Sequence, residues 1–177
     1  NIDIYPKFKI KIMKNIFFLI IIFFVSCQTN ETIQNKDNKI DQLFSNNCKT
    51  VESYLSDFVN ESIDYKKYYN DTCKIRGTYF NSVGPMSVED RKSTHKLMWA
   101  KYDFSFSDSI VFLPGVNVET KEIDGSVRFY CDFSVKNTEN EKTVTLPIYQ
   151  SYDFDSDGKF IYLQYFGDLN AAISSIE

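Results

Sequence analysis

Apolar and polar residues are distributed along the chain in three ways, and each predicts a different kind of segment. Residues 16–25 form an unbroken apolar run of ten residues. Residues 28–46 are mainly polar. From about residue 47 onward, apolar residues recur first at helical and then at strand spacing. The pattern indicates one folded domain over 47–177, preceded by a leader and a polar linker.

The first part of this domain is predicted to be a helix. Apolar residues at i, i+3, i+7, i+10 and i+11 share one helix face, namely Cys48, Val51, Leu55, Phe58 and Val59. Asn46 or Asn47 is the expected N-cap. The opposite face is expected to be exposed and carries Lys49, Glu52, Ser53 and Asn60.

A short helix and a strand are predicted next. The short helix covers 63–69, and Asn70-Asp71 ends it because both residues favour turns. Residues 73–80 then have the composition of a strand, and residues 81–85 form a turn. The polypeptide is therefore expected to reach the sheet only after residue 72.

A longer helix is predicted from residue 88 to about residue 101. It is preceded by a capping box, in which the Ser87 hydroxyl accepts a hydrogen bond from the backbone N–H of Asp90. Three apolar residues are expected near the buried end of this helix: Leu97, Met98 and Trp99.

The rest of the chain has strand character. Residues 103–113 predict a strand pair or one irregular strand, ended by Pro114-Gly115. Residues 126–135 alternate cleanly, with one face formed by Val127, Phe129, Cys131, Phe133 and Val135. Residues 137–141 form a polar turn.

Two more strands and a hairpin complete the pattern. One face of the first strand carries Val144, Leu146, Ile148, Tyr152 and Phe154. Pro147 indicates a sheet edge or a bulge in that strand. Residues 155–158 predict a hairpin turn, residues 159–166 the last strand, and residues 171–176 a frayed terminal turn.

The order of these elements defines the fold class. Helices come first, and strands joined by short turns follow. This order indicates an α+β domain, in which N-terminal helices pack on one face of a curved antiparallel sheet.

Composition adds that the domain has a core and an acidic surface. The chain of 177 residues is 43% hydrophobic and 16% aromatic, which is enough apolar material for one core. The first 27 residues contain four lysines and one acid, so the remainder carries 16 of the 20 basic and 23 of the 24 acidic residues. Because contacts to phosphates need a basic surface, nucleic acid is not an expected partner.

The apolar run near the N-terminus resembles a bacterial lipoprotein signal. Ten residues are too few to span a membrane as a helix, which takes about 20. Lys11 and Lys14 precede the run. The sequence Phe24-Val25-Ser26-Cys27 resembles a lipobox, with Phe24 in place of the commoner Leu. We therefore predict cleavage before Cys27 and attachment of lipid to its sulfur.

This interpretation divides the N-terminal region into three parts. Residues 1–12 are an expected upstream extension, 13–26 the signal peptide, and 27–46 the lipidated Cys27 with a polar tether. No Asp follows Cys27, which by analogy with enterobacterial sorting predicts the outer membrane, on the periplasmic side or at the cell surface. The alternatives are an ordinary signal peptide or an uncleaved anchor.

The other cysteines do not indicate a zinc site. Cys48, Cys73 and Cys131 show no Cys-x-x-Cys spacing, and the chain has one histidine. If Cys27 is lipidated, these three allow either one disulfide with a free thiol or three thiols. We expect no metal.

Three aspartates before Gly158 resemble the start of a calcium loop. Gln164 stands where the EF-hand pattern needs Glu, so a hairpin explains Asp153, Asp155 and Asp157 better. The chain also lacks a nucleophile elbow, a P-loop and a dinucleotide fingerprint, and no cofactor is expected.

The C-terminal motifs resemble the nuclear transport factor 2-like superfamily, and within it the SnoaL-like polyketide cyclase branch. The resemblance rests on Asp157-Gly158-Lys159-Phe160 and Tyr165-Phe166-Gly167-Asp168-Leu169, and on a helix pair ending in Tyr68-Tyr69. It covers about 47–177 and implies a cone-shaped α+β barrel, a cystatin-like roll, closing around a pocket. It also implies, for the enzymes of the family, an Asp or His that carries a proton for a small apolar substrate.

Two residues are candidates for catalysis on this basis. Asp168 matches the acidic residue that closes the family's last strand, but Tyr165 stands where the enzymes often have a second carboxylate. A cap of the final turn is the favoured role for Asp168. His95 is the only histidine and therefore a candidate base, although a solvated helix residue is the favoured interpretation.

Three further residues are candidates for lining a ligand pocket: Trp99, Gln150 and Tyr152. The competing interpretation is ordinary core packing. Tyr130 and Asp132 share the polar face of their strand with Arg128 and are expected on the convex face or at a dimer contact.

The preferred hypothesis is a membrane-tethered, non-catalytic domain that binds a ligand or assists another envelope protein. It rests on the lack of a converging His/Asp or Cys/His constellation. The first alternative is an isomerase, cyclase or dehydratase that uses general acid–base catalysis, so the question of enzyme activity stays open. The second is a structural lipoprotein that binds other proteins. The expected partners are the membrane, a small apolar ligand and a second copy of the chain.

Overall fold

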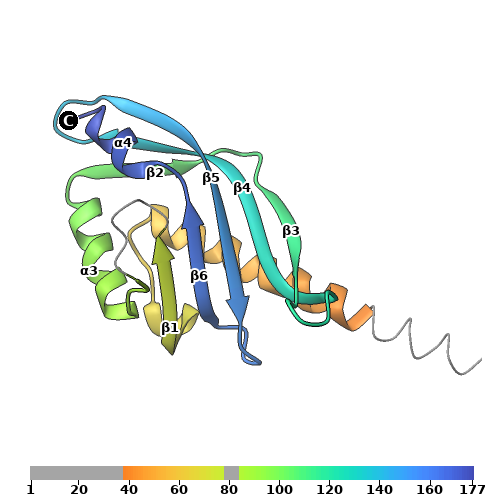
Figure 1. Ribbon diagram of the computed structural model, residues 1–177. Helices are drawn as coiled ribbons and strands as arrows, with labels where there is room; N and C mark the ends of the chain where they lie inside the picture. Colours follow the sequence, from red (N-terminus) through yellow and green to blue (C-terminus); the bar gives the residue numbers. More distant parts are fainter. Residues whose placement is uncertain (1–37, 78–83) are drawn as a thin grey trace, which may run out of the picture. The chain divides into compact units, whose positions relative to one another are not determined.

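The computed structural model describes residues 38–77 and 84–177, and Gln42–Glu177 form one compact unit (Figure 1). The predicted upstream extension, the signal peptide and Cys27 lie outside the described residues. Within the described ranges, no helix is long and apolar enough to cross a membrane.

The first described element is a helix that covers 38–59, here called the N-terminal helix. Its apolar face contains Val51, Leu55 and Phe58, as predicted, but Val59 is exposed. The predicted cap at Asn46 or Asn47 is wrong, because the helix already includes 38–46. The buried Asn47 instead donates a side-chain hydrogen bond to the Gly125 carbonyl oxygen at 2.8 Å.

The second helix is shorter than predicted. Helix α2 (Tyr65–Tyr68) is capped by the Asp64 side chain, which accepts from the Lys66 backbone N–H. Strand β1 (Tyr69–Gly77) begins directly after α2. The helix ends before Asn70-Asp71, as predicted, but both residues lie in the strand and not in a turn. The predicted extension of this strand to residue 80 lies outside the described residues.

Helix α3 (Val88–Trp99) has the predicted capping box. The Ser87 hydroxyl accepts from the Asp90 N–H at 3.2 Å, and the Asp90 carboxylate accepts from the Ser87 N–H at 3.0 Å. Met98 and Trp99 are half-buried, whereas Leu97 is 74% exposed and its predicted burial is wrong. The cap fixes the start of the helix, and tertiary packing selects the face that is buried.

The strands form one curved sheet, which confirms the α+β class (Figure 1). The order is β1-β6-β5-β4-β2, and β3 also pairs with β4. Strand β1 is parallel to β6, and the other pairs are antiparallel. The remaining strands are β2 (Tyr102–Phe106), β3 (Val111–Val116), β4 (Ile123–Asn137), β5 (Thr143–Phe154) and β6 (Phe160–Phe166). Figure 1 shows the N-terminal helix, in orange, running across one face of this sheet.

The sequence assigned roles to two prolines in the sheet, and the structure agrees with one of these predictions. Pro114-Gly115 was expected to end a strand but lies inside β3, where the register shifts between Pro114 and Val116. A Cβ at Gly115 would lie 2.0 Å from the Ser126 Oγ, so a larger residue there would displace the Ser126 hydroxyl. Pro147 of β5 lies beyond Tyr149, the last residue paired with β6, so it occupies a local edge as predicted.

The C-terminal part follows the predicted hairpin but ends in a packed helix. Gly158 has a positive φ of 75°, and the Asp155 carboxylate accepts from the backbone N–H groups of Asp157 and Lys159. Helix α4 (Leu169–Ser174) replaces the predicted frayed turn. Because Ala172 and Ile176 are buried, packing stabilises a segment that is too short to be helical alone.

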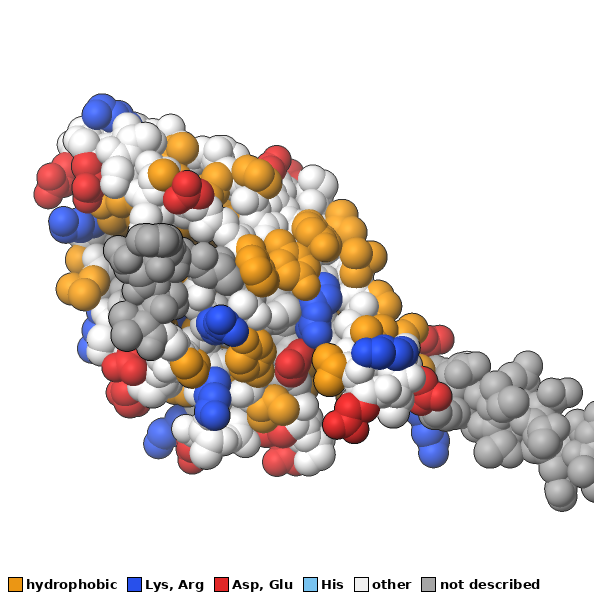
Figure 2. Space-filling view, in the orientation of Figure 1, with side chains coloured by type: hydrophobic (Ala, Val, Ile, Leu, Met, Phe, Trp, Pro, Cys, Tyr) orange, Lys and Arg blue, Asp and Glu red, His pale blue; other side chains and the backbone are white. Residues whose placement is uncertain are grey.

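The outer face of the sheet exposes apolar side chains. Figure 2 shows them gathered over β3, β4 and β5. Tyr130 contacts Tyr149 at a ring-centroid distance of 4.8 Å, and Tyr149 contacts Phe166 at 5.3 Å. Tyr130 is 47% exposed and Asp132 is also exposed, as expected for the convex face.

Candidate functional site

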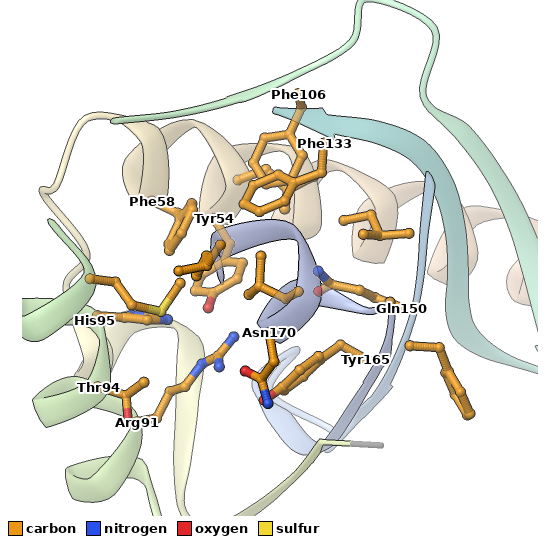
Figure 3. Close-up of a pocket in the computed structure, with 17 residues that line it drawn as sticks. Tyr54, Phe58, Arg91, Thr94, His95, Phe106, Phe133, Gln150, Tyr165 and Asn170 are labelled. Carbon is orange, nitrogen blue, oxygen red and sulfur yellow. The ribbon is translucent and has the colours of Figure 1, made fainter. Parts of the chain in front are cut away.

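A cavity of about 240 Å³ lies between the concave face of the sheet and the helices (Figure 3). Every layer of the fold contributes to its wall. The helical lining residues are Tyr54, Leu55, Phe58, Arg91, Thr94, His95, Met98, Leu169, Asn170 and Ile173. The sheet and the residue after it contribute Phe106, Phe133, Ile148, Gln150, Tyr165, Phe166 and Gly167.

The wall is mostly apolar, with polar groups concentrated on α3 and the strands facing it. Aromatic rings pack along one side. The ring centroids of Phe58 and Phe104 are 5.2 Å apart, and those of Phe106 and Phe133 are 5.1 Å apart. Two lining residues, Phe166 and Asn170, are exposed and mark an opening where α4 follows β6. The cavity can therefore admit a small molecule from solvent.

Arg91 is the one charged side chain among the described residues that line the cavity. Figure 3 shows its guanidinium pointing inward, toward the Tyr54 hydroxyl and the side chain of Asn170. Its charge lies 5.1 Å from the centroid of the Tyr165 ring. No carboxylate in the described residues forms an ion pair with it, and its buried Nε has no hydrogen-bond partner.

Burial works to lower the pKa of Arg91, but the surrounding tyrosines, Tyr54 foremost, outweigh it and hold the pKa above its ordinary value. The guanidinium is therefore charged at any pH at which the protein is folded. It places a fixed positive charge in a largely apolar space.

His95 lies one helical turn after Arg91 and is fully buried. The predicted solvated histidine is therefore wrong. Its Nδ1 lies 2.7 Å from the Tyr65 hydroxyl, and its buried Nε2 has no partner among the described residues. Burial, with a smaller effect of the Arg91 charge, lowers the pKa of His95 to about 2. The ring is consequently neutral at physiological pH and cannot take up a proton there.

Two hydrogen-bonded tyrosine hydroxyls, those of Tyr69 and Tyr54, lead to the cavity wall. The Tyr69 hydroxyl donates to the Tyr54 hydroxyl at 2.7 Å, so the Tyr54 proton is free to point into the cavity. Complete burial raises the pKa of Tyr69 well above its ordinary value, which keeps this hydroxyl a donor. Gln150 lines the cavity, and its side-chain oxygen accepts from the Tyr152 hydroxyl at 2.6 Å.

Solved structures of low sequence identity share the fold of this chain. A candidate polyketide cyclase from Xanthomonas campestris pv. campestris is 14% identical, with a TM-score of 0.58 over 76% of this chain and 99% of that chain. A candidate isomerase from Bacillus subtilis is 8% identical, with a TM-score of 0.59 over the same shares. An epoxide hydrolase of the LEH-like type from M. tuberculosis is 13% identical, with a TM-score of 0.52 over 75% and 85%. These likenesses show the fold, which is the cone-shaped nuclear transport factor 2-like fold.

No protein-family model matches the sequence, and no curated protein matches it. The likeness is thus one of fold, and the residues in the cone have to be judged individually.

Within the nuclear transport factor 2-like cone, the residues expected from the sequence occupy different places. Gln150 is in the cavity wall. Tyr152 is fully buried beneath it, between Phe129 and Phe160. Trp99 is outside the wall, packed 5.1 Å from the His95 ring.

Asp168 is exposed and caps α4 by accepting from the Ala171 N–H at 3.3 Å. It is not part of the cavity wall, although its neighbours Gly167 and Leu169 are. This placement agrees with the capping role and gives no support to a proton carrier inside the cone.

The aspartates that resemble the start of a calcium loop make contacts within the protein. Asp153 forms an ion pair with Arg128 at 3.1 Å, whereas the Asp155 carboxylate accepts from the Asp157 N–H in the hairpin turn. Within the described ranges, no group of three acids, cysteines or histidines could hold a metal. The three cysteines described, Cys48, Cys73 and Cys131, are free thiols.

Sequence reasoning missed Arg91 and Tyr54. A signal for the first was present, because Arg91 and His95 are four residues apart and Met98 follows three residues later. Those spacings place the three on one helix face. An arginine on the face that also carries apolar residues marks a candidate for an inward-pointing charge.

Proposed function

We propose that this domain binds a small, largely apolar organic molecule in the cone cavity and does not convert it chemically. The cavity carries the proposal, because it is preformed, lined mainly by aromatic and aliphatic side chains, and furnished with a few polar groups. Its volume of about 240 Å³ lies below the range of about 300–1,000 Å³ that is typical of drug-sized ligands. A molecule of modest size fits it best.

The lack of a suitable base favours binding over catalysis. General acid–base chemistry needs a group whose pKa is close to the working pH. The described cavity wall contains no Asp, Glu or Lys. His95 does line it, but its pKa of about 2 keeps the ring neutral and weakly basic.

The second candidate is an isomerase, cyclase or dehydratase. It is supported by the candidate cyclase and candidate isomerase among the fold relatives. It is also supported by Arg91 and Tyr54, which could stabilise an oxyanion that develops on a bound substrate. Turnover of a bound molecule, followed by mass spectrometry, would favour this candidate over the first.

We also propose that the domain is held on the outer membrane by lipid on Cys27. The basic, apolar and small-residue order before Cys27 supports this. A tethered binding domain would meet ligands that partition between membrane and water. The proposed partners are accordingly the membrane and a small ligand, with a second copy of the chain as a further partner.

Binding can be tested by titrating the protein calorimetrically with a panel of six- to ten-carbon alcohols, amides and acids, both aliphatic and aromatic. Ile173→Trp should fill the cavity from α4 and weaken binding at least tenfold. Leu97→Trp adds the same bulk on the exposed face of α3 and should leave affinity unchanged.

Thermal unfolding of both variants verifies that they are folded. If no member of the panel binds, or if Ile173→Trp binds as well as the unmodified protein, the proposed function is wrong.

A further inference from the structure

The Arg91 side chain is half-buried, its Nε is fully buried, and its guanidinium lacks the carboxylate partner that a cation removed from water normally has. Removing a charge from water costs several kcal/mol, and proteins usually offset this with a carboxylate. Among the described residues, Arg91 has the face of the Tyr165 ring at 5.1 Å and no acidic side chain. Its Nε–H is buried with no acceptor. Among the described residues, therefore, the guanidinium has no anionic partner and its Nε–H has no acceptor.

The groups beside Arg91 are also donors. The Tyr54 hydroxyl accepts a hydrogen bond from the Tyr69 hydroxyl and can donate its own proton to a ligand. The Tyr65 hydroxyl lies 2.7 Å from Nδ1 of His95, and a hydroxyl that donates to Nδ1 leaves the ring proton on Nε2. In that tautomer the buried Nε2, which has no partner among the described residues, is a third donor.

We infer that the molecule bound in the cavity is an amphipathic carboxylate, whose carboxylate accepts from Arg91 and Tyr54 and whose apolar part lies against Phe106 and Phe133. This inference rests on the proposed function and names the chemical class of its ligand. A guanidinium presents N–H groups in a planar fork that matches the two oxygens of a carboxylate.

The charge balance favours a carboxylate over a phosphate. One guanidinium with neutral donors offsets a single negative charge, and the described wall adds no second cation. The domain around it is acidic, with 23 acidic and 16 basic residues after position 27. An anion is therefore drawn to this place by the local site and not by the overall charge.

The two ends of the cavity orient the ligand. Arg91 and His95 lie on α3, while Phe106 and Phe133 lie on β2 and β4. Figure 3 shows the guanidinium well separated from the Phe106 and Phe133 rings, so polar and apolar ends face each other across the space. A short acid with a hydrocarbon or aromatic body satisfies both ends at once.

A matched pair of probes tests the inference. Octanoate and octanamide have the same length and differ in charge, and both are titrated into the protein, Arg91→Gln and Lys96→Gln. Lys96 is exposed on the same helix, so its substitution removes one positive charge outside the cavity. We expect octanoate to bind about 10- to 100-fold more tightly than octanamide, the range given by a hydrogen bond to a charged group. Arg91→Gln should abolish this preference, and Lys96→Gln should keep it.

Tyr54→Phe provides a second variant that preserves shape. It should weaken octanoate binding about three- to tenfold and octanamide binding by less, because the hydroxyl donates a stronger hydrogen bond to a charged acceptor than to a neutral amide oxygen. Equal affinity of the protein for the two probes would overturn the inference while leaving the proposed binding function intact. An unchanged preference in Arg91→Gln would also overturn it. If neither probe binds and the wider panel also fails, both the inference and the proposed function are wrong.

Discussion

At the scale of single residues, the polar groups in the cavity have a cost when no ligand is present. A buried guanidinium loses its hydration shell, and an acceptor of opposite charge normally replaces it. Arg91 has no such acceptor among the described residues, and the Nε–H is unpartnered. We therefore expect Arg91 to lower the stability of the ligand-free protein.

This cost predicts a stability gain when the charge is removed. Arg91→Met keeps the length of the side chain and places an apolar group against an apolar wall. We expect the ligand-free variant to unfold at a higher temperature, with a gain of about 1 kcal/mol in the free energy of unfolding. Calorimetry of the ligand-free proteins measures this change.

Arg128→Met is the matched control. Arg128 pairs with Asp153 at 3.1 Å on the other face of the sheet, so its loss should lower stability or leave it unchanged. A marked loss of stability in Arg91→Met would mean that the guanidinium has a structural partner.

His95 predicts a specific dependence of stability on pH. Its pKa is about 2 in the folded protein, because of burial and then the nearby Arg91 charge, and about 6.5 when unfolded. Between these values the unfolded state binds a proton that the folded state does not. The stabilisation that comes from keeping His95 neutral is therefore complete above about pH 6.5, and it is lost as the pH falls below that value.

We expect the protein to lose about 1 kcal/mol more stability than His95→Gln between pH 7 and pH 5.5. Urea denaturation at the two pH values measures this difference. The groups facing the ring are the Arg91 guanidinium on α3 and the Tyr65 hydroxyl on α2, whose pKa is raised by burial, and neither changes charge in this interval. Parallel pH profiles for the two proteins would mean that the folded histidine titrates normally.

At the scale of secondary-structure elements, α3 determines the site because it carries both Arg91 and His95. The helix begins at a capping box whose two hydrogen bonds satisfy N–H groups that would otherwise have no partner. The cap therefore fixes where the helix starts and, through the helical repeat, which residues face the cavity.

Ser87→Ala should lower the free energy of unfolding by about 1 kcal/mol, the usual effect of losing a serine cap. Octanoate affinity should fall as well if the first turn frays, since Arg91 is the fourth residue of the helix. Chemical denaturation and titration calorimetry measure the two effects. Ser93→Ala, in the middle of the same helix, removes a hydroxyl that contacts only the Glu89 carbonyl oxygen and should be neutral. Equal losses in both variants would contradict the importance of the cap.

The elements that the sequence predicted best are those whose signals are local. The capping box at Ser87 and the alternation from Val127 to Val135 depend on neighbours in the chain, and both are present. The helical segment 38–46 was missed because polar residues outnumber apolar ones in it. Helix α4 was missed because burial of Ala172 and Ile176 depends on strands distant in sequence.

The cavity was harder to predict because it depends on side chains converging from separate elements. Gln150 could be named from its aromatic surroundings, but Arg91 resembles any surface arginine until α3 is placed against β6. Tyr152 has the amphipathic character of a ligand contact, yet its hydroxyl is satisfied by Gln150. Sequence periodicity identifies the inward face of an element and does not distinguish a cavity from a filled core.

At the scale of the whole molecule, the two faces of the sheet differ in what they offer. The concave face forms the cavity, whereas the convex face carries the contacting rings of Tyr130, which is exposed, and Tyr149, which is half-buried. Exposed aromatic clusters are common at protein contacts. The predicted homodimer stays a prediction, and the cavity does not depend on it because its wall comes from one chain.

The proposed lipid anchor on Cys27 predicts where the protein is found in the cell. A single thiol, Cys27, follows the apolar run and is expected to receive the lipid. Multiple acyl chains on one residue hold a protein on a membrane far more stably than one chain does. Cells grown with labelled palmitate should incorporate label into the protein, which should sediment with membranes. Cys27→Ala should lose the label and fractionate without membranes.

Cys48→Ala is the matched control for this experiment. Cys48 lies in the N-terminal helix, and burial, together with the Glu52 charge, raises the pKa of its thiol to about 11. It is therefore a poor acyl acceptor, and its removal should leave labelling and membrane association intact. Label that persists in Cys27→Ala would rule out this anchor and leave an ordinary signal peptide or an uncleaved apolar segment. The mass of the intact mature chain separates those two outcomes, because only the second retains residues 13–26.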